Sequence, residues 1–239
     1  MKRGFLIVVV IGCLILIAIP LLSGCNKSSA PSPTLSATEI IDQCSGRMET
    51  VDSFHIEITQ VGGTTPLAMG LEMSKAAGDV VRPDRLKAEI TATVSGLPVR
   101  VEVITVGNMT FVTNPLTGKW EPFPSQFSAA GIFDPDTGIA AVLRHGTNLS
   151  KLEDQNAAGL PCYHIKGNIT TDDLVPITRL FTLNSLKGVD IATDIWCDKG
   201  DFLLRQIRLE GQITAEEKPG IIRTITLSDF NESVQIELP

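Results

Sequence analysis

Aromatic residues and positive charges are both scarce in this chain of 239 residues. Phe, Trp and Tyr make up 5% of it, and 20 Lys and Arg stand against 27 Asp and Glu, which gives a formal net charge of −7. Nucleic-acid-binding domains carry an excess of positive charge, so this balance argues against a nucleic-acid partner. An anionic membrane surface would also repel such a protein rather than attract it.

Sequence motifs of catalysis are missing as well. We find no nucleophile elbow with a following Asp and His, no metal-ligand spacing and no phosphate-binding glycine loop. Asp134, Asp136 and Thr137 precede an expected helix at residues 139–144, so Asp136 or Thr137 is interpreted as its N-cap. The isolated histidines are interpreted as solvated strand or helix residues: His55, His145 and His164. The sequence therefore predicts no enzyme activity, no metal and no other cofactor.

One long apolar run, residues 5–22, follows Lys2 and Arg3. A positive start, an apolar centre and small residues at the end are typical of a secretory signal peptide. Residues 22–25, Leu-Ser-Gly-Cys, resemble a bacterial lipobox, which implies acylation of Cys25 and removal of residues 1–24. An uncleaved anchor is the alternative, because a run of this length just spans a bilayer. Either way, the rest of the chain lies outside the cytoplasm.

The stretch after the apolar run is polar. Residues 25–35 comprise the lipidated Cys25 and a segment rich in Ser and Pro, which we interpret as a disordered tether. Residues 36–239 are long enough for a single domain with a sizeable core. Two or more acyl chains hold a protein stably at a membrane, so we expect this domain at the outer face of the cell membrane.

Hydrophobic periodicity predicts a helix and then many strands. Ser36 and Glu39 have the spacing of a capping box, and an apolar face follows at helical intervals: Ile40, Cys44, Met48 and Val51. From residue 53 onward the apolar period is two, which indicates strands with one buried face. Further helices are expected at residues 139–144 and 172–186.

These elements predict an α+β fold with one antiparallel sheet of about nine or ten strands. A one-sided sheet of that length must curl. The expected architecture is a strongly bent half-barrel, with helices on its concave face around an apolar cavity. We expect a cavity volume of several hundred Å³, the scale usual for ligand pockets.

Apolar side chains of the buried strand faces and of the 172–186 helix are the candidate lining of that cavity. Many are Met or Val, which suit an adaptable pocket for acyl chains. An ordinary packed core is the competing interpretation. The candidates are Met69, Leu71, Met73, Leu86, Ile90, Val99, Val101, Val103, Met109, Phe111, Ile177, Leu180 and Phe181.

Three cysteines follow Cys25, which allows one disulfide in an oxidising compartment. Cys162 and Cys197 lie at the ends of expected strands and form the candidate pair. Their positions in the strand alternation differ, so the disulfide stays an open alternative. Cys44 is assigned to the core of the first helix.

Several stretches resemble the actinobacterial LppX/LprAFG lipoproteins and, in outline, the Lol-type lipoprotein carriers. They are the lipobox, SFHIEI, GNMTFV, GKWEPF, FDPDTGIAAVL and the segment from DFLLRQIRLEGQI to the end. The resemblance implies a bent antiparallel sheet with an apolar cavity, and a monomer that carries acylated lipids or glycolipids across or within the envelope. An envelope transporter is a candidate partner. The 172–186 helix departs from the family in its length and apolarity, which suggests a reshaped cavity.

A non-catalytic sensor or scaffold that binds a protein partner is the second hypothesis. An exposed helix or strand edge, or a cavity too small for an acyl chain, would favour it.

Overall fold

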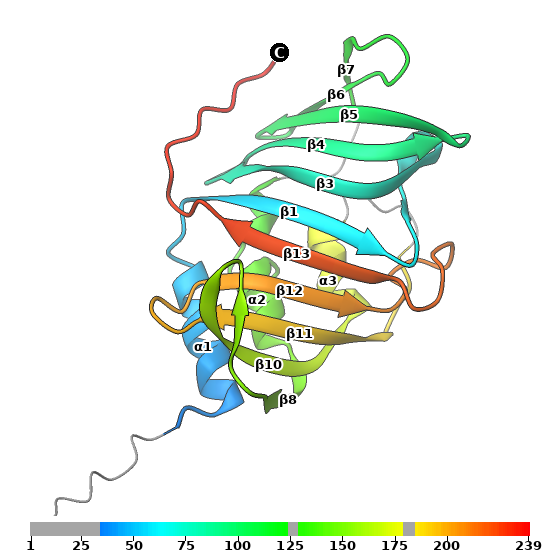
Figure 1. Ribbon diagram of the computed structural model, residues 1–239. Helices are drawn as coiled ribbons and strands as arrows, with labels where there is room; N and C mark the ends of the chain where they lie inside the picture. Colours follow the sequence, from blue (N-terminus) through cyan, green and yellow to red (C-terminus); the bar gives the residue numbers. More distant parts are fainter. Residues whose placement is uncertain (1–33, 124–128, 179–184) are drawn as a thin grey trace, which may run out of the picture. The chain divides into compact units, whose positions relative to one another are not determined.

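A computed structural model describes residues 34–123, 129–178 and 185–239. Residues 35–239 form a compact unit of their own, with one main hydrophobic core (Figure 1). In chain order, the elements are α1 (Ala37–Met48), β1 (Ser53–Val61), β2 (Thr65–Pro66), the 3₁₀ turn η1 (Ala68–Gly70), β3 (Leu71–Val81), β4 (Arg85–Val94), β5 (Leu97–Val106), β6 (Met109–Thr113), β7 (Trp120–Pro122), the 3₁₀ turn η2 (Ala129–Ile132), α2 (Ile139–Arg144), β8 (Thr147–Lys151), β9 (Gln155–Ala157), β10 (Leu160–Thr170), α3 (Thr171–Thr178), β11 (Asp190–Asp198), β12 (Leu204–Glu210) and β13 (Ile222–Ser228).

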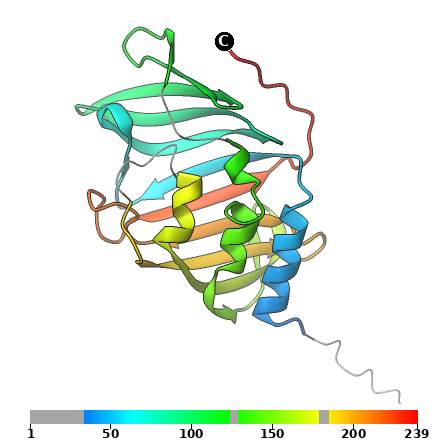
Figure 2. The same ribbon diagram turned by 180° about the vertical axis from the view of Figure 1, so that it is seen from behind.

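The strands form one antiparallel sheet of 13 strands, in the order β7-β6-β5-β4-β3-β1-β13-β12-β11-β10-β8. β2 pairs with β3, and β9 pairs with β10. The sequence predicts fewer strands because β2, β7 and β9 have only two or three residues, too few to show an alternation. β8 is also not predicted, since Leu149 is its only apolar residue. The sheet is curved, and Figure 2 shows α1, α2 and α3 together on one of its faces. The predicted α+β half-barrel is confirmed.

Helix α1 begins and packs as the sequence predicts. The N–H of Glu39 donates to Ser36 Oγ, and the Glu39 carboxylate accepts the N–H of Ser36 at 2.8 Å. These bonds lower the pKa of Glu39, with the backbone bond from Ser36 as the largest cause. The apolar face is buried, and it also contains a polar residue, Ser45, whose hydroxyl donates to the carbonyl of Ala140 at 2.8 Å. This bond ties α1 to α2.

The predicted cap of α2 is wrong. Gly138 is the N-cap residue, and it has no side chain to accept a helix N–H. Asp134 instead closes the preceding turn, because its Oδ1 accepts the N–H groups of Asp136 and Thr137 at 2.9 and 2.8 Å. These bonds lower the pKa of Asp134, with the Asp136 N–H as the largest cause. Gly138 is required here because a Cβ would lie 2.4 Å from the carbonyl oxygen of Ile132.

The helix expected at residues 172–186 is helical at its start and not helical at Ser185. α3 is described as far as Thr178, the last residue before a gap in the described residues, and Ser185 on the other side of the gap forms an antiparallel bridge with Thr214 instead of belonging to a helix. Ile177 belongs to α3. Leu180 and Phe181 lie outside the described residues.

The candidate disulfide between Cys162 and Cys197 is not formed. In the register of β10 and β11, Cys162 pairs with Asp198, whereas Cys197 pairs with Tyr163. The two thiols therefore lie on opposite faces of the sheet, Cys162 in a small cluster with Trp196 and Cys197 in the main core. Cys197 instead contacts Cys44 of α1. Burial raises the pKa of Cys44 well above its usual value, and the hydrogen bond with Cys197 raises it further.

Candidate functional site

An apolar cavity of about 130 Å³ lies between the concave face of the sheet and the helical layer. Its wall contains two polar residues, Thr65 and Arg223, and otherwise only apolar ones. The sheet and the chain after β12 contribute Ile56, Ile58, Met73, Ala76, Ala77, Val80, Leu86, Ala88, Ile169, Leu204, Ile207, Leu209, Ile213, Ile225 and Leu227, and η2 and the helices contribute Ile132, Ile139, Val142 and Leu174.

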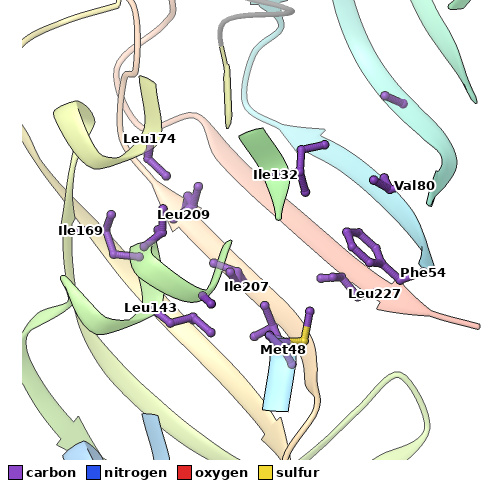
Figure 3. Close-up of a cluster of buried hydrophobic side chains, with 14 of the residues drawn as sticks. Met48, Phe54, Val80, Ile132, Leu143, Ile169, Leu174, Ile207, Leu209 and Leu227 are labelled. Carbon is purple, nitrogen blue, oxygen red and sulfur yellow. The ribbon is translucent and has the colours of Figure 1, made fainter. Parts of the chain in front are cut away.

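The cavity is smaller than the several hundred Å³ that the sequence analysis predicts. Branched side chains fill the rest of the hollow from both layers. Figure 3 shows Ile207, Leu209 and Leu227 of the sheet together with Ile132 and Leu143 of the helical layer. The remaining space is therefore bounded by apolar side chains on both sides.

Short side chains on β3 and β4 leave this space open. Ala76 and Ala88 lie in the cavity wall, and Gly78 between them permits a close approach of the two strands. A Cβ at Gly78 would lie 2.2 Å from the Lys87 carbonyl oxygen. In the centre of the sheet the helical layer leaves three isoleucines only half-buried although they face the cavity: Ile56, Ile58 and Ile225.

Most of the predicted lining residues on strands lie at apolar hollows. Met73 and Leu86 belong to the main cavity. A second apolar pocket, of about 30 Å³, adjoins η1 at the β3–β6 half of the sheet. Five further candidates lie in its wall: Met69, which belongs to η1 and not to a strand, and Leu71, Ile90, Val101 and Val103. Val99 packs against the core but lies in neither wall.

Met109 and Phe111 do not lie on the concave face, so their prediction is wrong. Gly107 and Asn108 form a two-residue hairpin loop in which Val106 pairs with Met109. That register places Val112 beside Val103 on the concave side and Phe111 beside Ile104 on the other. Met109 is 54% exposed. The Gly-Asn pair is itself a hairpin signal, and reading it as such fixes the correct face.

The part of the wall that β1, β12 and β13 contribute is not predicted from the sequence. These segments are expected to be strands, but none of their residues is among the candidate lining. The alternation in residues 221–227 was the available signal, since Ile221, Arg223, Ile225 and Leu227 share one face. Arg223 is the exception in that series, a charged residue at an apolar position.

Arg223 is 5% exposed and belongs to a buried polar cluster at one end of the cavity. Its Nε and Nη2 donate to Thr65 Oγ1 at 3.3 and 3.2 Å, and its Nη1 donates to the carbonyl of Gly211 at 3.0 Å. Nη2 also forms an ion pair with Glu217, which is fully buried. The other carboxylate oxygen of Glu217 accepts the backbone N–H groups of Ile213 and Thr214 at 2.7 and 3.1 Å. The charges of this cluster are thus paired internally.

The described residues contain no group of three His, Cys, Asp or Glu side chains that could hold a metal ion. Among the helices of this part of the chain, none is long and apolar enough to span a membrane. What the described site offers is apolar surface with one polar end.

Comparison with known proteins identifies the family of this chain. The model of the LppX_LprAFG lipoprotein family matches residues 36–236. The chain belongs to this family. Membership makes it an envelope lipoprotein, as the resemblance of its motifs predicts.

Two relatives align over nearly the whole chain. The lipoarabinomannan carrier protein LprG of Mycolicibacterium smegmatis is 26% identical, over 93% of this chain and 92% of its own length. LprG of Mycobacterium leprae is 27% identical, over 91% and 87%.

Two crystal structures share the fold. LprF of Mycobacterium bovis superposes with a TM-score of 0.65 at 18% identity, covering 85% of this chain and 96% of that one. LppX of Mycobacterium tuberculosis gives a TM-score of 0.60 at 17% identity, with coverages of 84% and 98%. At these identities, the likeness concerns the fold alone.

Proposed function

We propose that this lipoprotein binds the acyl chains of lipids or glycolipids in the cavity and carries them within or across the cell envelope. The observation that carries the proposal is a wall of apolar side chains with a single polar end, between a curved sheet and a helical layer. Such a wall excludes water and accepts methylene chains. Each CH₂ group buried there contributes about 0.8 kcal/mol to the free energy of binding. The names of the LprG relatives, lipoarabinomannan carriers, support the same class of ligand.

Entry of an acyl chain requires the cavity to widen. Among the side chains that narrow it, the unbranched Met73 adapts most readily, whereas the β-branched Ile and Val side chains are stiff at χ1. Met73 at the wall and the η2 residue Ile132 are the groups whose displacement would lengthen the cavity along the sheet. Binding then selects the wider arrangement.

The anchor is part of the proposal. Residues 1–24 act as a signal peptide, and Cys25 carries the lipid. Residues 26–35 are the tether, and residues 36–239 form the binding domain at the outer face of the cell membrane. In this scheme the protein is a monomer without catalytic activity, and an envelope transporter loads or unloads it.

A sensor or scaffold that binds a protein partner is the second candidate. The volume of about 130 Å³ favours it, because ligand pockets usually reach about 300 Å³ or more. In that case the helical layer stays closed, and no lipid is taken up.

Native mass spectrometry separates the two functions. The unit of residues 35–239 is produced in a bacterium with a rich pool of envelope lipids and purified without detergent. A stoichiometric adduct that organic extraction releases as an acylated lipid is the result expected of a carrier. A ligand-free mass, together with no uptake of fluorescent fatty-acyl probes, would contradict the carrier and favour the scaffold.

A further inference from the structure

The polar end of the cavity contains a buried arginine, which a purely apolar pocket does not require. Arg223 follows the alternation of Ile225 and Leu227 and so points to the concave face among apolar neighbours. Its partners in the adjacent strands are Leu209 and Gln60. An apolar residue at this position would continue the wall, yet the chain places a guanidinium there.

Arg223 has one N–H donor without a hydrogen-bond acceptor in the described part of the chain. A guanidinium has five N–H groups, and the bonds to Thr65, Gly211 and Glu217 use four of them. The remaining N–H, on Nη1, has no acceptor among the residues that the structure describes. Beside this cluster, the hydroxyl of Thr214, a residue only 1% exposed, also lacks a partner in the described part of the chain. Buried donors without acceptors are costly. Of these two groups only Arg223 lies in the cavity wall, so its spare N–H makes this end of the cavity suited to receive a polar group.

Glu217 determines whether the polar group of the ligand should be charged or neutral. Because Glu217 is fully buried and paired with Arg223, the cluster carries no net charge. A ligand carboxylate or phosphate would lose its hydration there and meet the Glu217 carboxylate without a net positive charge in return. An uncharged carbonyl oxygen accepts the spare N–H without either cost.

We infer that Arg223 binds the ester or amide carbonyl of an acylated ligand, and that the pocket selects uncharged acyl esters or amides over free fatty acids. This inference rests on the proposed function and adds the chemical class of the ligand. The acyl chain then extends from Arg223 over Leu209 and Ile225 toward the centre of the sheet.

Paired fluorescent probes test the selectivity. Parinaric acid and its methyl ester have the same chain and differ in the charge of one end at pH 8. The methyl ester is expected to bind the 35–239 unit about tenfold or more tightly than the acid. Equal affinities, or tighter binding of the acid, would overturn the inference.

Variants test the role of Arg223 itself. R223M is expected to weaken binding of the methyl ester about tenfold, since hydrogen bonds to charged groups are strong. R208M is the matched control, because Arg208 lies on the same sheet but pairs with Asp194 and Glu210 outside the cavity. An R223M protein that melts cooperatively and binds the ester as wild type does would refute the assignment.

The variant E217Q distinguishes ligand binding by Arg223 from a purely structural role, because a structural role predicts no change in the relative affinity for acid and ester. It leaves the cluster with a net positive charge, so the acid is expected to gain affinity relative to the ester. An unchanged ratio in the folded variant would contradict the argument from charge. Should E217Q fail to fold, the double variant R223M/E217Q removes both charges, and its loss of ester affinity must match that of R223M.

Diphenylhexatriene separates this inference from the proposed function. It is wholly apolar and requires only the cavity. If it binds while the two parinaric probes show no selectivity, the carrier function stands and the inference fails. If no probe binds wild-type protein, the carrier function itself fails.

Discussion

Substitution of Ala76 by Leu would fill the cavity and separate its effect on stability from its effect on binding. Ala76 lies in the cavity wall on β3 and is 4% exposed. Leucine adds three carbons to a space of about 130 Å³. At about 0.8 kcal/mol per buried carbon, the free energy of unfolding is expected to rise by up to about 2 kcal/mol. For a unit of this size, that corresponds to an increase in Tm of about 4–8 °C.

The matched control is A92L. Ala92 is 1% exposed on the neighbouring strand β4 and lies in the wall of neither apolar pocket described above. Extra carbons in a packed core force strain, so A92L is expected to lose about 1–3 kcal/mol. The assays are thermal unfolding and binding of diphenylhexatriene, which A76L should abolish while it raises Tm. The reasoning is refuted if A76L loses stability as A92L does, or if it gains stability and still binds the probe as wild type does.

Further predictions concern the frame around the cavity. G78A is expected to lower the free energy of unfolding by more than about 2 kcal/mol, because its Cβ would overlap the backbone of β4. G46A in α1, where a Cβ meets nothing within 4 Å, should raise the free energy of unfolding by up to about 1 kcal/mol. Urea unfolding of both variants measures the two changes. S45A removes the buried bond to the Ala140 carbonyl and the bond that Arg144 Nη1 donates to the same hydroxyl, and it should cost about 1–2 kcal/mol in the same assay. An unchanged midpoint would show that the bonds of Ser45 do not stabilise the contact of α1 with α2. The raised pKa of Cys44 makes stability depend on pH. Below about pH 8.5, the usual thiol pKa, both the folded and the unfolded thiol are neutral; at higher pH the unfolded thiol ionises first, so stability falls as pH rises. Urea unfolding at pH 7.5 and pH 10 should show a smaller fall in C44A, and an equal fall in both proteins would contradict this origin.

The sequence predicts the sheet well because its alternation is strong. β4 and β5 have regular apolar and polar positions, and residues predicted on the concave face, such as Leu86 and Val103, are buried there. The capping box of Ser36 is likewise a local signal, since its donor and acceptor lie three residues apart. Where structure is set by neighbours in the chain, the prediction holds.

Errors arise where a turn or a distant contact decides the outcome. The hairpin at Gly107 reverses the face of β6, so large apolar residues such as Phe111 lie away from the cavity. The register of β10 and β11 separates Cys162 from Cys197, and no local pattern reveals that Cys197 meets Cys44 instead. The wall contributed by β12 and β13 depends on the pairing of β13 with β1, which is far away in sequence, and on the pairing of β12 with β13.

Anomalous diffraction from a bromine-labelled acyl ester tests the central claim most directly. Crystals of the 35–239 unit are grown with a methyl ester that carries bromine in mid-chain, and the bromine is located independently of any assumption about the lipid. The account predicts a peak between Ile207 of the sheet and Ile132 of η2, inside the apolar wall. A peak on the outer face of the sheet, or none from protein saturated with the ester, would contradict it.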